Sequence, residues 1–277
     1  MKMKTIKTTL LALSMLASAG VAFAQGFQFD TSRIAERPRA ELPKERMTLK
    51  SFEASTALRA LPEQEKVEKS ERIASRIVEF TRSWRIERDP IEGALLLAQP
   101  AENPRTEGEG DERKLRDASV SLLARLGVPQ NEIGRVVTRS LLASDSDSDQ
   151  KEPGRPQLIL YKTFVVREIN GVPVEGHRAV VSHAPSGALH RANLLWPALA
   201  REGHKLATRL TVPEITVRAA EVLRRSGENQ GKVVLRWKYV PIRQPSGEVV
   251  LRLAVGARIQ SVPGRETREI TVPVDAL

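Results

Sequence analysis

Residues 158–196 form the stretch that decides the fold, LILYKTFVVREINGVPVEGHRAVVSHAPSGALHRANLLW. Apolar and polar side chains alternate along most of it, which is typical of strands with one buried face. Asn170-Gly171 and Ser186-Gly187 interrupt the alternation, and both dipeptides favour tight turns between antiparallel strands. We therefore predict an antiparallel meander with strands at 158–169, 172–184 and 188–196.

Two-residue turns fix the register of such a meander, so its two faces can be predicted. Phe164 is expected opposite His177, and His183 opposite His190. The apolar face should contain Leu158, Leu160, Phe164, Val166, Ala179, Val181, Ala192, Leu194 and Trp196. The polar face should contain Thr163, Arg167, Arg178, Ser182, Arg191 and Asn193. We expect a helix to cover the apolar face, with Phe164 and Trp196 in the core.

Helices are predicted on both sides of the meander. Residues 111–126 carry apolar side chains at helical spacing, and Gly127 ends the pattern. Residues 211–226 open with Thr211 and Glu214, the two residues of a capping box. Further strands are expected at 133–142, 233–239, 249–259 and 269–274. A helix and its strands thus occur twice, which predicts the α+β class.

The N-terminal part of the chain is divided by composition. Residues 1–24 combine a basic start, an uncharged apolar run and the site Ala22-Phe23-Ala24, as in a cleavable signal peptide. Residues 25–61 are polar, which predicts a poorly ordered lead. Residues 62–110 should hold a helix and a linker, the helix spanning 62–84 with the stripe Ile73, Ile77, Phe80 and Trp84. The α+β units then span 111–200 and 201–277.

The predicted signal peptide implies export, to the periplasm or the extracellular space. The chain contains no Cys, which excludes disulfides, thiolate metal sites and cysteine catalysis. After signal cleavage, no segment is apolar enough to predict a transmembrane span.

One part of the meander resembles a known group of families. It is residues 167–187, REINGVPVEGHRAVVSHAPSG, which is similar to the PepSY domain and the fungalysin/thermolysin propeptide (FTP) domain. The matching residues are Asn170, Gly171, Val172, Pro173, Val174, Gly176 and Gly187. Glu175 departs from the pattern, because those propeptides more often carry an aromatic residue there, and no HExxH motif or peptidase domain follows.

The resemblance implies both a fold and a role. The implied fold is α+β, with antiparallel sheets each packed by a helix, in two related cystatin/PepSY-like units. The implied role is a module that binds or restrains a partner protein, often a secreted peptidase, and that is not an enzyme.

Charge is distributed unevenly along the chain. Residues 155–277 carry 19 Lys and Arg against 10 Asp and Glu, whereas residues 25–154 carry 22 against 24. In the C-terminal strands, alternation places four cations on one outer face, Arg236, Lys238, Arg252 and Arg258. This face is the candidate binding site, for an acidic protein surface or an anionic polymer of the cell envelope. The alternative is a face that is merely solvated. Aromatic residues are few and none lies on this outer basic face, so nucleic-acid binding is not predicted.

Other motifs that could carry chemistry are incomplete. The run of Asp145, Asp147 and Asp149 lacks the glycine and the bidentate acid of a calcium loop. The expected pair of His183 and His190 has no third ligand, so no metal or cofactor is predicted. Neither a nucleophile elbow nor a dinucleotide-binding fingerprint occurs.

The leading hypothesis is therefore an exported, non-enzymatic protein-binding module of the protease-inhibitor or propeptide kind. Two alternatives stay open: an envelope-binding protein that uses the basic face, and a hydrolase without a recognisable motif.

Overall fold

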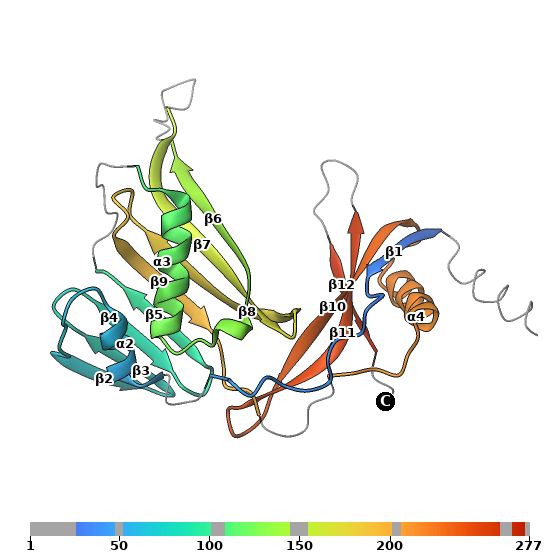
Figure 1. Cartoon of the computed structure of the whole chain (residues 1–277), viewed down its shortest axis with the longest axis horizontal. Coiled ribbons are helices and arrows are strands. Elements are labelled where there is room, and N and C mark those ends of the chain that lie inside the picture. Colours follow the sequence, from blue (N-terminus) through green and yellow to red (C-terminus); the bar gives the residue numbers. More distant parts are fainter. Residues whose placement is uncertain are drawn as a thin grey trace, which may run out of the picture. The chain divides into compact units, whose positions relative to one another are not determined.

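The computed structural model describes residues 26–47, 52–100, 109–144, 155–200, 206–260 and 268–274. The predicted signal peptide and the aspartate run at 145–149 lie outside these residues. Within them the chain forms twelve strands and three α-helices, with 47% of residues in strands and 18% in helices (Figure 1). Mixed β-sheet therefore dominates, and the predicted class, antiparallel sheets each packed by a helix, is wrong.

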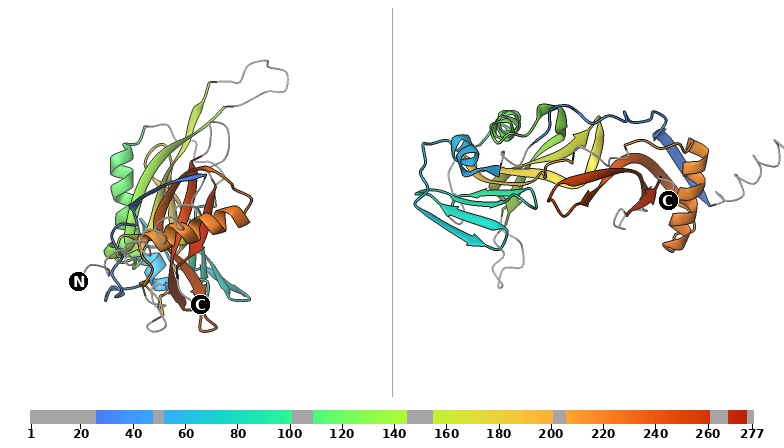
Figure 2. Two further views of the ribbon diagram at one scale, coloured as in Figure 1. Left: turned by 90° about the vertical axis from the view of Figure 1, so that its right-hand side faces the viewer. Right: turned by 90° about the horizontal axis from the view of Figure 1, so that it is seen from below.

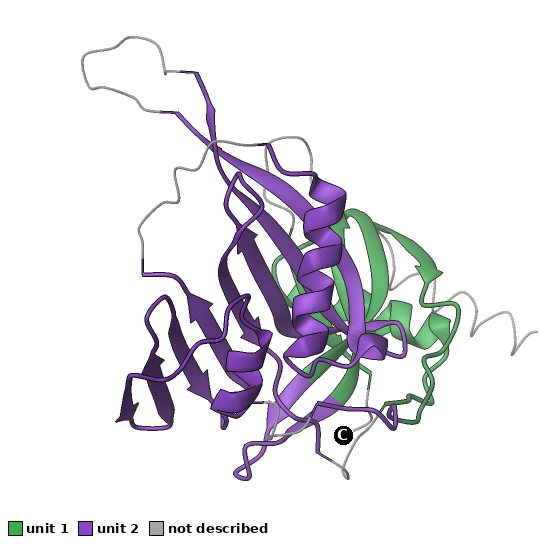
Figure 3. Ribbon diagram, turned by 60° about the vertical axis from the view of Figure 1, so that its left-hand side comes forward, with its two compact units in different colours: residues 1–41, 205–240, 252–277 green, residues 42–204, 241–251 purple. Residues whose placement is uncertain are grey.

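The chain divides into two compact units (Figure 3). Unit 1 comprises residues 1–41, 205–240 and 252–277, and unit 2 comprises residues 42–204 and 241–251. Each unit is thus assembled from segments that are far apart in the sequence.

Unit 2 contains an antiparallel sheet with the strand order β6-β7-β8-β9-β5-β4-β3-β2. The strands are β2 (Lys69–Ile73), β3 (Arg76–Phe80), β4 (Arg85–Asp89), β5 (Ala94–Ala98), β6 (Ile133–Ala143), β7 (Gln157–Ile169), β8 (Val172–His183) and β9 (Leu189–Leu195).

Two helices, α2 (Ala54–Ala60) and α3 (Glu112–Arg125), lie on one face of this sheet (Figure 2, right). The helix predicted at 111–126 is confirmed as α3. Asp111 caps it, because Asp111 Oδ1 accepts hydrogen bonds from the backbone N–H groups of Arg113 (2.8 Å) and Lys114 (3.2 Å). The core between helices and sheet includes Phe52, Ile86, Leu97, Leu122, Leu123, Val165, Ala179, Leu194 and Trp196.

The predicted meander is confirmed as β7, β8 and β9. The register between β8 and β9 is as predicted where Ala179 pairs with Leu194. Between β7 and β8, a bulge between Val166 and Glu168 shifts the pairing. Phe164 consequently lies opposite Val180, and the predicted pairing with His177 is wrong.

The bulge exchanges the two faces of β7, because side chains alternate with a period of two. Phe164, predicted in the core, is 42% exposed, and Arg167, predicted on the outer face, is fully buried. The predicted position of Trp196 is confirmed, since its side chain has no exposed surface.

The helix predicted over residues 62–84 is wrong, because this segment forms the hairpin of β2 and β3. Arg72 pairs with Ile77, and Ala74 between them adopts a positive φ of 56°. Apolar residues spaced three or four apart fit a helix, but they fit two short strands joined by a turn equally well. The lead at 25–61, predicted to be poorly ordered, supplies a strand and helix α2.

Unit 1 contains a mixed sheet and one helix. The elements are β1 (Phe27–Arg33), α4 (Val212–Arg225), β12 (Glu269–Pro273) and the larger parts of β10 (Gly231–Arg243) and β11 (Val249–Gln260), whose ends at 241–251 belong to unit 2. β1 runs parallel to β10, and β12 runs antiparallel to β11. The helix predicted at 211–226 is confirmed as α4, with its capping box: Glu214 Oε2 accepts a hydrogen bond from the Thr211 backbone N–H at 2.6 Å.

Over the described ranges, no helix is long and apolar enough to cross a membrane.

Candidate binding surfaces

The four cations predicted as a binding site lie in unit 1, Arg236 and Lys238 on β10 and Arg252 and Arg258 on β11. Their surroundings differ. The side chain of Lys238 is 5% exposed and that of Arg236 is 39% exposed, whereas Arg252 and Arg258 are exposed. The sequence pattern therefore places the four residues on suitable strands, but two of them are much less accessible than alternation suggests.

Glu269 neutralises part of this basic face. Its Oε2 lies 2.5 Å from Arg236 Nη2, and its Oε1 lies 3.5 Å from Lys238 Nζ. Glu269 reaches β10 from β12 by crossing β11 at Gly256, where an added Cβ would lie 2.5 Å from Glu269 Oε1. Glu269 was not predicted as part of this face, although it is the first residue of the strand expected at 269–274. Arg252 and Arg258 form no ion pair with any residue the structure describes.

A second surface, on unit 2, was not predicted. It is the sheet face turned away from α2 and α3, which we call the open face. The residues that the strand register places on it at β6–β9 are Val137, Arg139, Leu141, Leu160, Lys162, Phe164, Val166, Arg178, Val180, Ser182, Arg191, Asn193 and Leu195.

Two rows of cross-strand neighbours give the open face its character. The cationic row runs across four strands as Arg139, Lys162, Ser182 and Arg191. The neighbouring row runs as Val137, Phe164, Val180 and Asn193. Arg139, Lys162 and Arg191 form no ion pair with another residue in the described ranges. The surface thus combines three cations that no described acidic residue pairs with and the exposed ring of Phe164.

The sequence contains the alternating residues that form the open face. The pairing register of β6, β7 and β8 is needed to see which of them lie together. Arg178 and Arg191 were correctly placed on the outer side of β8 and β9. Phe164 was assigned to the wrong side of β7, and β6 was not aligned with β7 at all. Without those two steps the cationic row and the apolar row cannot be seen.

A polar cluster at the centre of unit 2 has the composition of a catalytic site but is closed to solvent. Glu132 and Arg167 are both fully buried, and Arg167 Nε donates to Glu132 Oε2 at 2.9 Å. Trp196 Nε1 donates to the same oxygen at 2.9 Å, and Arg167 Nη1 donates to the Pro197 carbonyl at 2.7 Å. The cluster therefore holds β7, β9 and the segment before β6 together.

Titration of this cluster is strongly affected by its burial. Burial lowers the pKa of the Arg167 guanidinium, and Glu132 partly offsets the effect. Burial also lowers the pKa of His177 to about 3, with the positive charges of Arg167 and Arg243 acting in the same direction. His177 is therefore neutral at physiological pH, and its Nδ1, 3.3 Å from Arg167 Nη1, is free to accept a hydrogen bond.

The predicted pairing of His183 with His190 is wrong. A shift in register after Ser182 places His183 opposite Leu189. Burial lowers the pKa of both histidines. Among the described residues, no three His, Asp or Glu side chains lie close enough together to hold a metal ion.

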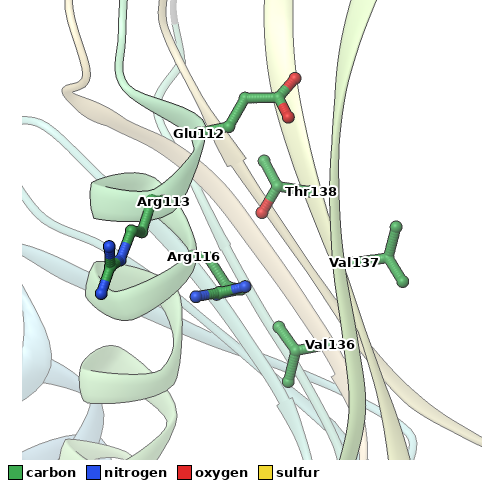
Figure 4. Close-up of a pocket in the computed structure, with 6 residues that line it drawn as sticks. All are labelled: Glu112, Arg113, Arg116, Val136, Val137 and Thr138. Atoms are coloured by element: carbon green, nitrogen blue, oxygen red, sulfur yellow. The ribbon is translucent and has the colours of Figure 1, made fainter.

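A third surface is a cavity of about 400 Å³ between α3 and β6 (Figure 4). Its lining residues are Glu112, Arg113 and Arg116 from α3 and Val136, Val137 and Thr138 from β6. The Arg116 guanidinium extends from the helix toward the strand, while Val136 and Thr138 point toward the helix and Val137 points away from it.

Comparisons with known proteins give little further identification. A scan against protein-family models finds no match, and a search of curated proteins finds none either. Two solved structures are similar at 11% sequence identity. One is the crystal structure of an uncharacterised protein from Eubacterium rectale, with a TM-score of 0.42 over 80% of this chain and 75% of that chain. The other is the C-terminal domain of YpeB from Bacillus megaterium, with a TM-score of 0.37 over 83% of this chain and 94% of that chain. At these scores the likeness to PepSY and propeptide modules stays a prediction from the sequence.

Proposed function

We propose that the chain is an exported, non-enzymatic module that binds an acidic protein through the open face of unit 2. The observation that carries the proposal is the cationic row beside the exposed apolar row. A secreted peptidase is the partner class that the sequence resemblance implies.

The cationic row should lower the stability of the isolated protein. Arg139 and Lys162 lie directly opposite each other on β6 and β7. Like charges at such cross-strand positions destabilise a sheet, and no described acidic residue pairs with either. An acidic partner would remove this repulsion, so the arrangement favours binding over a purely structural role.

The apolar row supplies the second half of the argument. Phe164 is 42% exposed and Leu141, farther along the same face, is 40% exposed. Large side chains that share one face in this way are typical of protein-protein contacts. A surface that is both apolar and cationic suits a folded protein with acidic and apolar groups better than it suits a uniformly charged polymer.

The test is a comparison of matched variants in a capture experiment. The mature protein would be immobilised and exposed to concentrated culture supernatant, together with the double variant Arg139→Glu, Lys162→Glu. The control is the double variant Arg72→Glu, Arg82→Glu, which changes two exposed arginines, one in β2 and one in the loop after β3, and carries the same change of charge. The proposal expects one protein to be retained by the wild type and the control but lost by the double variant. It also expects weaker retention at higher salt, because exposed charges are screened. Equal retention by all three proteins would refute the assignment to the open face.

A second candidate function uses the basic face of unit 1. Arg252 and Arg258 are exposed cations without a described partner, which suits an anionic polymer of the cell envelope. The double variant Arg252→Glu, Arg258→Glu would then release the protein from isolated cell envelopes, while the open-face variant would not. Unchanged sedimentation of the unit 1 variant with envelopes would exclude this candidate.

A further inference from the structure

Strand β6 lies at the edge of the sheet in unit 2. It pairs with β7 along one side, and no strand of the described residues pairs with its other side. Backbone N–H and C=O groups on the unpaired side of a strand can pair with an additional strand. The register of β6 with β7 is irregular between Ile133 and Val136 and continuous from Val136 to Leu141, so the regular part of the edge begins at Val136.

A cavity lies beside β6, between this strand and α3 (Figure 4). Val136 and Thr138 point toward α3 and Val137 points away from it, and all three residues line the cavity. Three consecutive residues of β6 thus border the cavity, so open space adjoins the backbone of this strand.

Positive charge lines the helix side of the cavity. Arg113 forms no ion pair in the part of the chain that the structure describes. Arg116 has one contact, 3.5 Å from its Nε to Asp117 Oδ1, in which both side chains are largely exposed. Exposed ion pairs of this kind contribute little to stability. The guanidinium groups of Arg113 and Arg116 are therefore both available to bind a carboxylate of a ligand. Glu112 is the single acid among the described lining residues.

We propose that the edge of β6 accepts an extended acidic peptide segment as an additional strand. Its backbone would pair with β6 from Val136 onward, and its carboxylates on the α3 side would contact Arg113 and Arg116. This site goes beyond the proposed function, because it uses the strand edge and the helix-facing side of β6, whereas the open face uses the opposite side.

A second copy of the chain is a poorer occupant of the same edge. Antiparallel pairing of β6 with its own copy would bring arginines of two copies together, from β6 itself (Arg135 and Arg139) and from α3 (Arg113 and Arg116). Like charges opposite each other destabilise such a pairing. An acidic segment, by contrast, matches the charge of the edge.

The experiment uses labelled peptides and fluorescence anisotropy with the full mature protein. The probe alternates glutamate and valine, and a lysine-valine peptide of equal length is its charge control. Two further probes carry N-methyl groups on alternate residues, one on the odd positions and one on the even positions. An added strand donates to its neighbour from every second residue, so one methylated probe should fail to bind while the other binds normally.

The matched protein variants separate this site from its surroundings. Arg113→Glu with Arg116→Glu should weaken binding of the glutamate-valine peptide at least about tenfold. Arg125→Glu, at the far end of the same helix, should change it less than about twofold. A second open-face variant, Lys162→Glu with Arg191→Glu, changes two residues of the cationic row and none of β6, so it should bind the peptide normally. Failure of the proposed function and failure of this site then give different results.

Three results would overturn the inference. They are absence of binding at millimolar glutamate-valine peptide, equal binding of both methylated probes, and unchanged binding by the Arg113, Arg116 double variant. The methylated probes test wild-type protein, so the inference stays falsifiable even if the double variant does not fold.

Discussion

Arg167 and Glu132 are 35 residues apart in the sequence and form an ion pair with no exposed surface. Arg167 Nη2 lies 2.8 Å from Glu132 Oε2. Glu132 ends the short 3-10 helix η2 (Gln130–Glu132), and Arg167 belongs to β7. The pair therefore connects the segment after α3 to the middle of the sheet. Because both charges have been taken out of water, each depends on the presence of the other.

Removal of one partner should destabilise unit 2 strongly. Glu132→Gln would leave the Arg167 charge buried without its counter-ion, at a cost of about 3–5 kcal/mol in the free energy of unfolding. The paired replacement Glu132→Leu, Arg167→Met should cost clearly less, because no charge stays buried. Urea denaturation of the three proteins measures both effects. A loss below about 1 kcal/mol for Glu132→Gln would contradict the buried position of the pair.

Stability should fall with decreasing pH because of His177. The folded protein holds the pKa of His177 at about 3, whereas the unfolded chain protonates near the ordinary value. Above the ordinary histidine pKa of about 6.5, His177 is neutral in both the folded and the unfolded protein. Between that pH and about 3, His177 gains a proton in the unfolded chain only. The free energy of unfolding should thus decrease toward low pH by up to about 1.4 kcal/mol per pH unit until the pH approaches 3.

The matched variant for this effect is His177→Asn, which cannot titrate. Between about pH 7 and about pH 5, where most carboxylates stay ionised, the wild type should lose more stability than the variant, in which His183 and His190 still contribute. Denaturant midpoints at the two pH values provide the comparison. Parallel curves for the two proteins would show that His177 is accessible to protons in the folded state.

Two aromatic residues of the meander should respond differently to truncation. Trp196→Ala should cost about 3–5 kcal/mol, because Trp196 is fully buried and its indole N–H binds Glu132. Phe164→Ala should cost less than about 1 kcal/mol, because the ring is 42% exposed. Thermal and chemical denaturation rank the two variants. Equal losses would mean that the bulge after Val166 is absent in solution.

Glu269 should stabilise unit 1 through Lys238. Glu269→Gln removes the acid that lies 3.5 Å from the nearly buried Lys238 Nζ, and a loss of about 1–3 kcal/mol is expected. Gly256→Ala should also destabilise the unit, since the new Cβ would displace Glu269 Oε1 from its position 2.5 Å away. Arg252→Gln is the control, because Arg252 is exposed and should change stability by less than about 0.5 kcal/mol. A Glu269→Gln variant as stable as the wild type would show that Lys238 does not need this partner.

Local patterns in the sequence determined the elements whose signals are short-range. The turns at Asn170-Gly171 and Ser186-Gly187, the helix from Glu112 to Arg125 and the capping box of Thr211 and Glu214 are all as predicted. Each depends on residues within a few positions of one another, so the physical cause lies within the segment itself. The hairpin at 69–80 was mistaken for a helix because its apolar spacing fits both structures, and pairing with β4 decides between them.

Tertiary structure decided which side chains meet. The bulge at Arg167, where residues 174–177 of β8 lie opposite a single residue of β7, reversed the faces of β7, buried Arg167 and exposed Phe164. Glu269 became the partner of Lys238 only because β12 lies beside β11 and Gly256 leaves room above the strand. Sequence alone determined the strands from β6 to β12 and the positive charge of the chain. The cationic row, the buried ion pair and the edge of β6 depend on strand register and strand order, which are set by contacts between residues distant in the sequence.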